Sequence, residues 1–194
     1  MSLEQDQPYI ERTLKGDMNA FTILVDRYKY MVFTLAMRMV KNREEAEEIA
    51  QDTFLKIYNG LEGFKGNSKF STWVYKIAYY RSLDYLKKLG RGMDSTSIEL
   101  FTEKQAAQEE DIVKRLEESE RSKSIKDALQ FLPGDDGILI TLHYYEELSL
   151  VEISQVMGIS VNNVKVKLFR ARKRLKQILI NKLEPEIISS YAKG

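Results

Sequence analysis

The sequence predicts an all-α protein with two small helical domains, joined by a flexible acidic linker, and a helix-turn-helix in the second domain. Apolar residues recur with helical spacing along most of the 194 residues. Strand signals are poor, because alternating runs are few and the chain has three prolines. Residues 94–120 hold nine acids and three bases and lie between the two helical parts. We expect domains at residues 1–90 and 122–194, with the linker at 91–121.

Composition excludes several classes of protein. Hydrophobic residues make up 43% and charged residues 30% of the chain, which is typical of a soluble globular protein. The absence of cysteine excludes disulfides and thiolate metal sites. The polar N-terminus does not resemble a signal peptide, and no apolar run reaches the ~20 residues that a membrane span needs.

Helix start signals organise the first domain. Residues 3–15 form a short helix that ends at Gly16, and Asp17 caps a long helix that runs to Val40. Asn42 caps the next helix, with Glu45 as its capping-box partner. The outward face of this third helix is acidic, and from the residues alone it is equally a solvated face or a docking surface. Its members are Glu44, Glu48, Gln51, Asp52 and Leu55.

A loop rich in glycine, asparagine and lysine, residues 63–69, precedes the fourth helix, residues 70–89. Phe70, Trp73 and Val74 begin its predicted buried stripe. The predicted exposed face interleaves aromatic and cationic side chains: Thr72, Tyr75, Lys76, Tyr79, Tyr80, Leu83 and Lys87. Such a face can stack on the bases of a single strand, although any one tyrosine can instead cover a seam between helices.

Between the first domain and residue 149, the sequence signals for helices are less regular. Residues 93–108 lack periodicity and are expected to form the linker, and helical spacing resumes near residue 109. Residues 133–136 form a turn. Residues 137–145 are rich in isoleucine and tyrosine, a composition typical of strands. We expect a helix there, because a helix-turn-helix needs a supporting helix in front of it.

Residues 149–176 predict the helix-turn-helix itself. Ser149 and Glu152 form a capping box, Gly158 ends the first helix, and Ser160 caps the second only two residues later. The second helix buries Val161, Val164, Leu168, Ala171 and Leu175. Residues 161–182 contain eight lysines and arginines and no acid, in a chain of net charge +1. This pattern favours DNA over the alternative of an acidic protein partner.

Enzyme chemistry is not expected. The sequence has no phosphate-binding glycine loop and no histidine-rich or cysteine-rich cluster. His143 is the single histidine and lies in an apolar stretch, where a packed residue is the expected role. Glu44, Glu45, Glu47 and Glu48 cannot converge on one cation from a single helix without partners. We therefore expect no metal and no cofactor.

The whole pattern resembles the extracytoplasmic-function sigma factors of bacterial RNA polymerase. Residues 17–89 resemble sigma domain two, through the helix of Phe21 and the motifs at residues 44–54 and 70–78. Residues 122–183 resemble sigma domain four, through Leu132-Pro133 and the motifs at 148–153, 158–160, 164–165 and 170–172. Two motif sets in this order, with a linker between them, are far more specific than a helix-turn-helix alone.

The resemblance implies a role for each surface. The acidic face would bind core RNA polymerase. The loop and the aromatic helix would capture and unstack the single-stranded −10 element, through Asn67, Ser68, Lys69, Trp73, Tyr75, Lys76, Tyr79 and Tyr80. The second helix of the helix-turn-helix would read the duplex −35 element, through Ser160, Asn162, Asn163, Lys165, Lys167, Arg170, Arg172 and Arg174.

It also implies a cytoplasmic protein, monomeric when free, that does not insert into membranes and is held by an anti-sigma factor. Gly137, Tyr80 and Lys167 depart from residues common in the family, which leaves the promoter sequence open. Two other interpretations remain from the residues alone. One is a dimeric helix-turn-helix regulator, and the other is a helical adaptor that binds only protein.

Overall fold

The computed structural model describes residues 3–90, 128–129, 131–132 and 134–182. Every regular element in these ranges is a helix, as predicted. The chain divides into two compact units, one containing residues 1–93 and 148–160, the other residues 94–147 and 161–194. The predicted linker and the helix expected from residue 109 lie outside the described residues, so both stay predictions.

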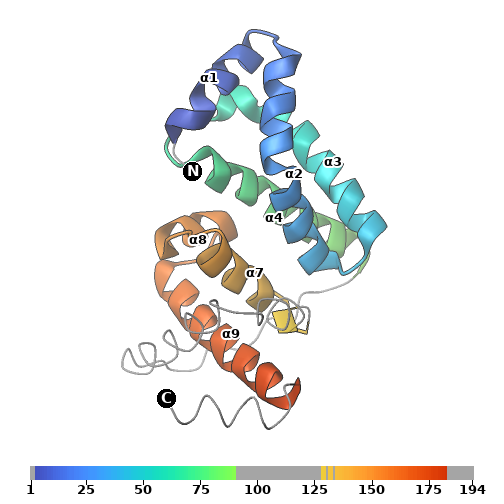
Figure 1. The fold of residues 1–194 in the computed structure, drawn as a ribbon, viewed down its shortest axis with the longest axis vertical. Coiled ribbons are helices and arrows are strands. Elements are labelled where there is room, and N and C mark those ends of the chain that lie inside the picture. The colour runs from blue at the N-terminus through green and yellow to red at the C-terminus, as the bar shows by residue number, and fades with distance from the viewer. Residues whose placement is uncertain (1–2, 91–127, 130, 133, 183–194) are drawn as a thin grey trace. The chain divides into compact units, whose positions relative to one another are not determined.

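Four N-terminal helices form most of the first unit, drawn from blue to green in Figure 1. They are α1 (Leu3–Leu14), α2 (Met18–Val40), α3 (Arg43–Gly60) and α4 (Phe70–Lys88), with a 3₁₀ turn at Leu61–Gly63. Helix α4 packs against α2, α3 and α8 (Leu150–Met157). The core between them follows the apolar spacing of the sequence and includes Leu24, Tyr28, Val32, Ile49, Ile57, Phe70 and Val74.

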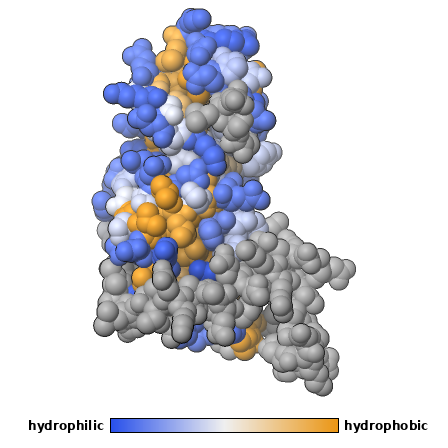
Figure 2. All heavy atoms as spheres, turned by 90° about the vertical axis from the view of Figure 1, so that its left-hand side faces the viewer, coloured by the Kyte–Doolittle hydropathy of each residue, from blue (hydrophilic) through white to orange (hydrophobic). Residues whose placement is uncertain are grey.

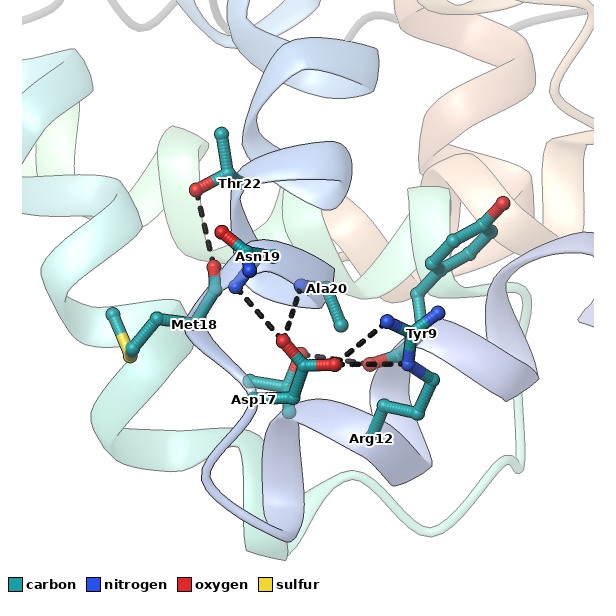
Figure 3. A network of polar contacts seen from close by, with 8 residues as sticks. Tyr9, Arg12, Asp17, Met18, Asn19, Ala20 and Thr22 are labelled. Carbon is teal, nitrogen blue, oxygen red and sulfur yellow. Dashed lines mark hydrogen bonds and ion pairs between the residues drawn. The ribbon is translucent and has the colours of Figure 1, made fainter.

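Asn42 and Asp17 cap their helices, as the sequence predicts. Asn42 Oδ1 accepts a hydrogen bond from the Glu45 amide at 3.0 Å. Asp17 Oδ1 accepts from the amides of Asn19 and Ala20, at 3.0 and 3.2 Å. Its other oxygen, Oδ2, accepts from the Arg12 guanidinium at 2.7 Å, so that one carboxylate joins the end of α1 to the start of α2 (Figure 3).

Asp17 makes the stability of the first unit depend on pH. The hydrogen bonds from Arg12 and from the amides of Ala20 and Asn19 hold the pKa of this carboxyl below its usual 3.8. Folding lowers the pKa of this carboxyl, so the ionised form stabilises the fold. This stabilisation is fully present at pH values above 3.8, and it is lost as the pH falls through the lower pKa of the folded state. We expect Asp17→Ala to melt below the wild type at pH 7 and the gap to narrow below about pH 4.

Thermal melts of both proteins between pH 7 and pH 3 check this expectation. Asp17→Asn is the matched variant, since the amide oxygen still caps α2 but attracts Arg12 less. Its melting temperature should lie between the other two at pH 7. A gap between wild type and Asp17→Ala that stays constant over the whole range would contradict the role of the charge.

The second unit is built on α7 (Asp136–Ile140), a π-helical turn at Thr141–Tyr145, and α9 (Val161–Lys182). Residues 137–145 are therefore helical, as predicted, and their closing turn has π-helical hydrogen bonding. Helix α7 packs against α9. Leu139 of α7 and Leu142 of the π-helical turn are buried in this unit. The predicted apolar stripe of α9 is buried at Val164, Leu168, Ala171 and Leu175.

The end signals of α8 are also confirmed. Ser149 and Glu152 form the complete capping box, with the Ser149 hydroxyl accepting from the Glu152 amide and the Glu152 carboxylate accepting from the Ser149 amide. Gly158 has a φ of 67°, the left-handed conformation that ends a helix and that a side chain would strain. Helix α9 then begins at Val161, directly after the serine predicted as its N-cap.

Candidate functional site

The acidic face of α3 is displayed as the sequence predicts. Glu44, Glu48 and Gln51 are exposed, and Leu55, one turn beyond Gln51 and Asp52 at the end of the face, is 61% exposed. The buried stripe lies on the opposite side of the helix and contains Ala46, Ile49, Thr53 and Ile57. An exposed leucine at one end of an acidic helix face gives a surface with both an apolar and a polar part, as protein-binding surfaces have.

Two side chains of α4 reach the same face. Arg81 binds the Asp52 carboxylate, and the Tyr85 hydroxyl donates to Glu48 Oε2 at 3.4 Å. Asp52 is therefore less open than its neighbours, since it has an ion-pair partner within its own unit. Both members of the Arg81–Asp52 pair are partly exposed, so the pair adds little to stability, but it fixes where the carboxylate points.

The loop before α4 displays Asn67, while Ser68 and Lys69 are half-buried. Gly66 has a φ of 70°, which turns the chain. Behind the loop, Phe64, Phe70 and Trp73 form an aromatic cluster with ring centroids 5.3–5.6 Å apart. Lys69 Nζ lies 3.0 Å from Glu152 Oε1. The loop thus rests on a rigid aromatic base that positions Asn67 and Ser68.

The exposed aromatic face predicted on α4 is only partly present. Lys76 is exposed and Tyr80 is 39% exposed, but Thr72, Tyr75 and Tyr79 are 2–4% exposed and belong to the core. The reason is that three helices pack against α4, so that more of its circumference is buried than a single stripe would require. The prediction that Tyr75 and Tyr79 are exposed is wrong, and their DNA contacts stay untested predictions.

Helix α9 carries the predicted cationic residues, with different degrees of access. Ser160 and Asn162 are exposed at the start of the helix, and Lys173 is exposed farther along. Asn163, Lys165 and Arg170 are partly exposed. Asn162 is the second residue of the helix. In helix-turn-helix proteins the side chains at the start of the recognition helix contact base edges, and the amide of Asn162 lies at such a position.

Three predicted DNA-contacting cations are buried or paired with acids within the fold. Arg172 is 5% exposed, and its Nε donates to the Leu168 carbonyl at 3.4 Å. Lys167 Nζ lies 3.4 Å from Asp135 Oδ2, and Arg174 Nη1 lies 2.6 Å from Asp136 Oδ2. The prediction that Arg172 faces solvent is wrong, because its side chain folds back on its own helix. Lys167 and Arg174 are partly exposed but pair with acids beside α7.

The acids that hold these cations were missed by sequence reasoning. Asp135 and Asp136 were assigned only to a turn, and Asp136 is in fact buried at the first residue of α7. Burial raises the pKa of the Asp136 carboxyl, an effect larger than the opposing one of the Arg174 hydrogen bond. The sequence does show two adjacent acids directly before an apolar stretch, which could have indicated buried carboxylates. It does not show which cations pair with them.

Within the described residues, no helix is long and apolar enough to cross a membrane. On the face drawn in Figure 2, hydrophilic side chains surround smaller hydrophobic patches. The large hydrophobic side chains exposed in the described parts include Leu55 and Val151. These features suit binding to proteins and nucleic acid at a polar surface.

A capped helix, a turn with a left-handed glycine and a long cationic helix follow one another in the chain, which defines the class of helix-turn-helix DNA-binding proteins. Comparison with known proteins identifies the family. The Sigma-70 region 2 family matches residues 24–92, and the Sigma-70, region 4 family matches residues 122–175.

Curated relatives match over nearly the full chain. The RNA polymerase sigma-H factor of Pseudomonas aeruginosa is 32% identical, with 92% of this chain and 96% of the relative covered. The ECF RNA polymerase sigma factor SigW of Bacillus subtilis is 34% identical, with coverage of 88% and 94%. The solved structure of CnrH in complex with the cytosolic domain of CnrY has the same fold, with a TM-score of 0.63, 20% identity and coverage of 92% and 99%.

The chain belongs to the extracytoplasmic-function sigma factors of bacterial RNA polymerase. It is a transcription initiation factor that directs core RNA polymerase to promoter DNA, and it is not itself an enzyme. Family membership decides against the dimeric regulator and the protein-only adaptor, which the residues alone had left open.

Proposed function

We propose that the acidic face of α3 binds core RNA polymerase, with Leu55 as its apolar contact and Glu44, Glu48 and Gln51 along the same face before it. The observation that supports this proposal is a helix face with exposed acids and, at its end, an exposed leucine, while the opposite side of the helix is buried. Asp52 joins the surface through the oxygen that Arg81 does not bind. Cations on the polymerase would pair with these carboxylates and fix the orientation of docking.

The loop before α4 and the open part of that helix capture the −10 element as a single strand. Asn67 and Ser68 offer hydrogen bonds to base edges, Lys76 offers charge to phosphates, and Trp73 and Tyr80 offer rings for stacking. Lys69 is left out of the phosphate contacts, because it pairs with Glu152. Unstacking a base costs a few kcal/mol, and a pocket that stacks and hydrogen-bonds the base offsets this cost. Tyr75 and Tyr79, which are buried, support this surface from beneath.

The N-terminal part of α9 reads the −35 element in the major groove. Asn162 and Asn163 present amides that can pair with the edge of an adenine, and Ser160 lies where the amides at the start of the helix can approach a phosphate. Lys165 and Arg170 are the cations of the predicted set that we assign to phosphates. Lys167, Arg172 and Arg174 are left out of this set, because of their pairing and burial.

The protein is expected to act in the cytoplasm, where RNA polymerase transcribes. An anti-sigma factor is a further expected partner. This expectation is supported by the family and by the sigma factor RpoE, whose structure with the anti-sigma factor NepR has the same fold as this chain at 20% identity.

Reconstitution with core RNA polymerase tests the function directly. The full chain should direct transcription from a subset of a promoter library randomised in both elements. We expect Asn162→Ala/Asn163→Ala to relax the −35 preference, with a loss of about 1–3 kcal/mol of discrimination for each lost bidentate pair, and to leave the −10 preference unchanged. Sequencing of the selected promoters is the measurement. An unchanged −35 preference would contradict the assignment of the two asparagines.

A further inference from the structure

The four charged side chains that join α7 to α9 stand apart from the proposed DNA contacts. Asp135 and Asp136 are consecutive, and their partners Lys167 and Arg174 are seven residues apart, on one side of α9. Side-chain exposure is 18% and 26% in the first pair and 10% and 33% in the second. These pairs are more buried than typical surface ion pairs, so salt screens them less.

This geometry limits what Lys167 and Arg174 can do at a DNA backbone. Moving either one to a phosphate would leave a carboxylate without that cation, and Asp136 is buried. An uncompensated charge at a buried site is strongly unfavourable.

We propose that Asp135 and Asp136 act as a carboxylate clamp that withholds Lys167 and Arg174 from the DNA backbone. This inference rests on the proposed contact of α9 with duplex DNA. A cation that is already paired releases no counterion from DNA, so it adds neither affinity nor salt dependence. Since contacts to phosphates are independent of sequence, the clamp weakens binding to every sequence equally.

The consequence is a gain in selectivity. A genome offers a very large excess of nonspecific sites, and what matters is the ratio of specific to nonspecific affinity. Removing two phosphate contacts lowers occupancy of nonspecific duplex, while the base contacts of Asn162 and Asn163 are retained. Asp135 and Asp136 are thus specificity-determining residues that act through Lys167 and Arg174 and do not touch DNA themselves.

The test is the salt dependence of binding to a labelled duplex of random sequence, measured by fluorescence anisotropy with the full chain between 50 and 200 mM salt. Asp135→Asn/Asp136→Asn removes the carboxylates that bind the two cations, so the slope of log K against log salt should steepen by about 1.8. Over this range the variant should lose about tenfold more affinity than the wild type loses. An unchanged slope overturns the clamp.

Two further variants make the result specific. Glu146→Gln/Glu147→Gln changes the net charge equally, at exposed residues of the same unit, and should keep the wild-type slope. If it steepens the slope as much as the aspartate variant does, net charge explains the effect and the clamp is overturned. Lys167→Gln/Arg174→Gln should also keep the wild-type slope, and a slope shallower by about 1.8 would show that both cations contact phosphates in the wild type.

The second of these variants keeps the proposal testable if the aspartate variant does not fold. The design also separates the clamp from the proposed function. A wild-type protein whose binding to duplex DNA does not depend on salt would overturn the DNA contact of α9 itself. Salt-dependent binding with equal slopes in the wild type and the aspartate variant would overturn the clamp alone.

Discussion

Glu48→Lys/Leu55→Ala should abolish the co-elution of this sigma factor with core RNA polymerase in gel filtration. The variant removes the exposed leucine at the end of the acidic face and reverses the charge of a carboxylate two turns before it on the same face. Buried apolar anchors and paired charges carry most of the energy of an interface, and losing a paired charge alone costs about 2–5 kcal/mol. We therefore expect affinity to fall more than a hundredfold, since about 2.8 kcal/mol corresponds to that factor.

The choice of residues matters because Asp52 is not a simple surface acid. Replacing Asp52 with lysine would set a cation against Arg81, which binds that carboxylate in the folded protein. A loss of binding would then combine weaker docking with a weaker contact between α3 and α4. Within the described residues Glu48 accepts a long hydrogen bond from Tyr85, at 3.4 Å, and makes no ion pair, so its replacement disturbs the fold less.

The matched control is Glu62→Lys/Leu14→Ala. It makes the same two chemical changes at exposed residues outside the acidic face of α3. This control should co-elute with polymerase as the wild type does, and both variants should melt within a few degrees of the wild type. Retained co-elution of Glu48→Lys/Leu55→Ala would mean that the polymerase binds a different surface of the chain.

The helix boundaries could be predicted because their signals are local. Asp17, Asn42 and Ser149 each hydrogen-bond amides two or three residues ahead, so the sequence around the cap contains both partners. Gly158 is similar, since a left-handed residue after an apolar stripe needs no distant contact. The acidic face of α3 follows from helical spacing once the buried stripe is known.

The predictions that failed depend on contacts between distant segments. Arg174 pairs with an acid 38 residues away, and a run of lysines and arginines does not show which of them will find partners in the fold. Tyr75 and Tyr79 are buried because three helices surround α4. A tyrosine suits either a core or a stacking surface, so its presence in the pattern could not decide between them.

Phe70→Ala should destabilise the first unit by about 3–5 kcal/mol, the range for phenylalanine removed from a core. Phe70 is 1% exposed and is the first residue of α4, directly after the loop assigned to the −10 element. Its ring contacts those of Tyr28, Phe64 and Trp73, with centroids 5.6, 5.3 and 5.6 Å away. Tyr28 in turn donates to Asp6 Oδ2 at 2.6 Å, so one side chain supports contacts among α1, α2, the loop and α4.

Urea denaturation of Phe70→Ala and the wild type measures this effect. Phe131→Ala is the control, because Phe131 is 55% exposed in the second unit and its removal should cost less than about 1 kcal/mol. Since Trp73 and the loop lose their packing partner, Phe70→Ala should also weaken binding to single-stranded −10 DNA at temperatures where it remains folded. An unchanged denaturation midpoint would show that the aromatic cluster does not hold the loop in place, and the −10 surface would then need another support.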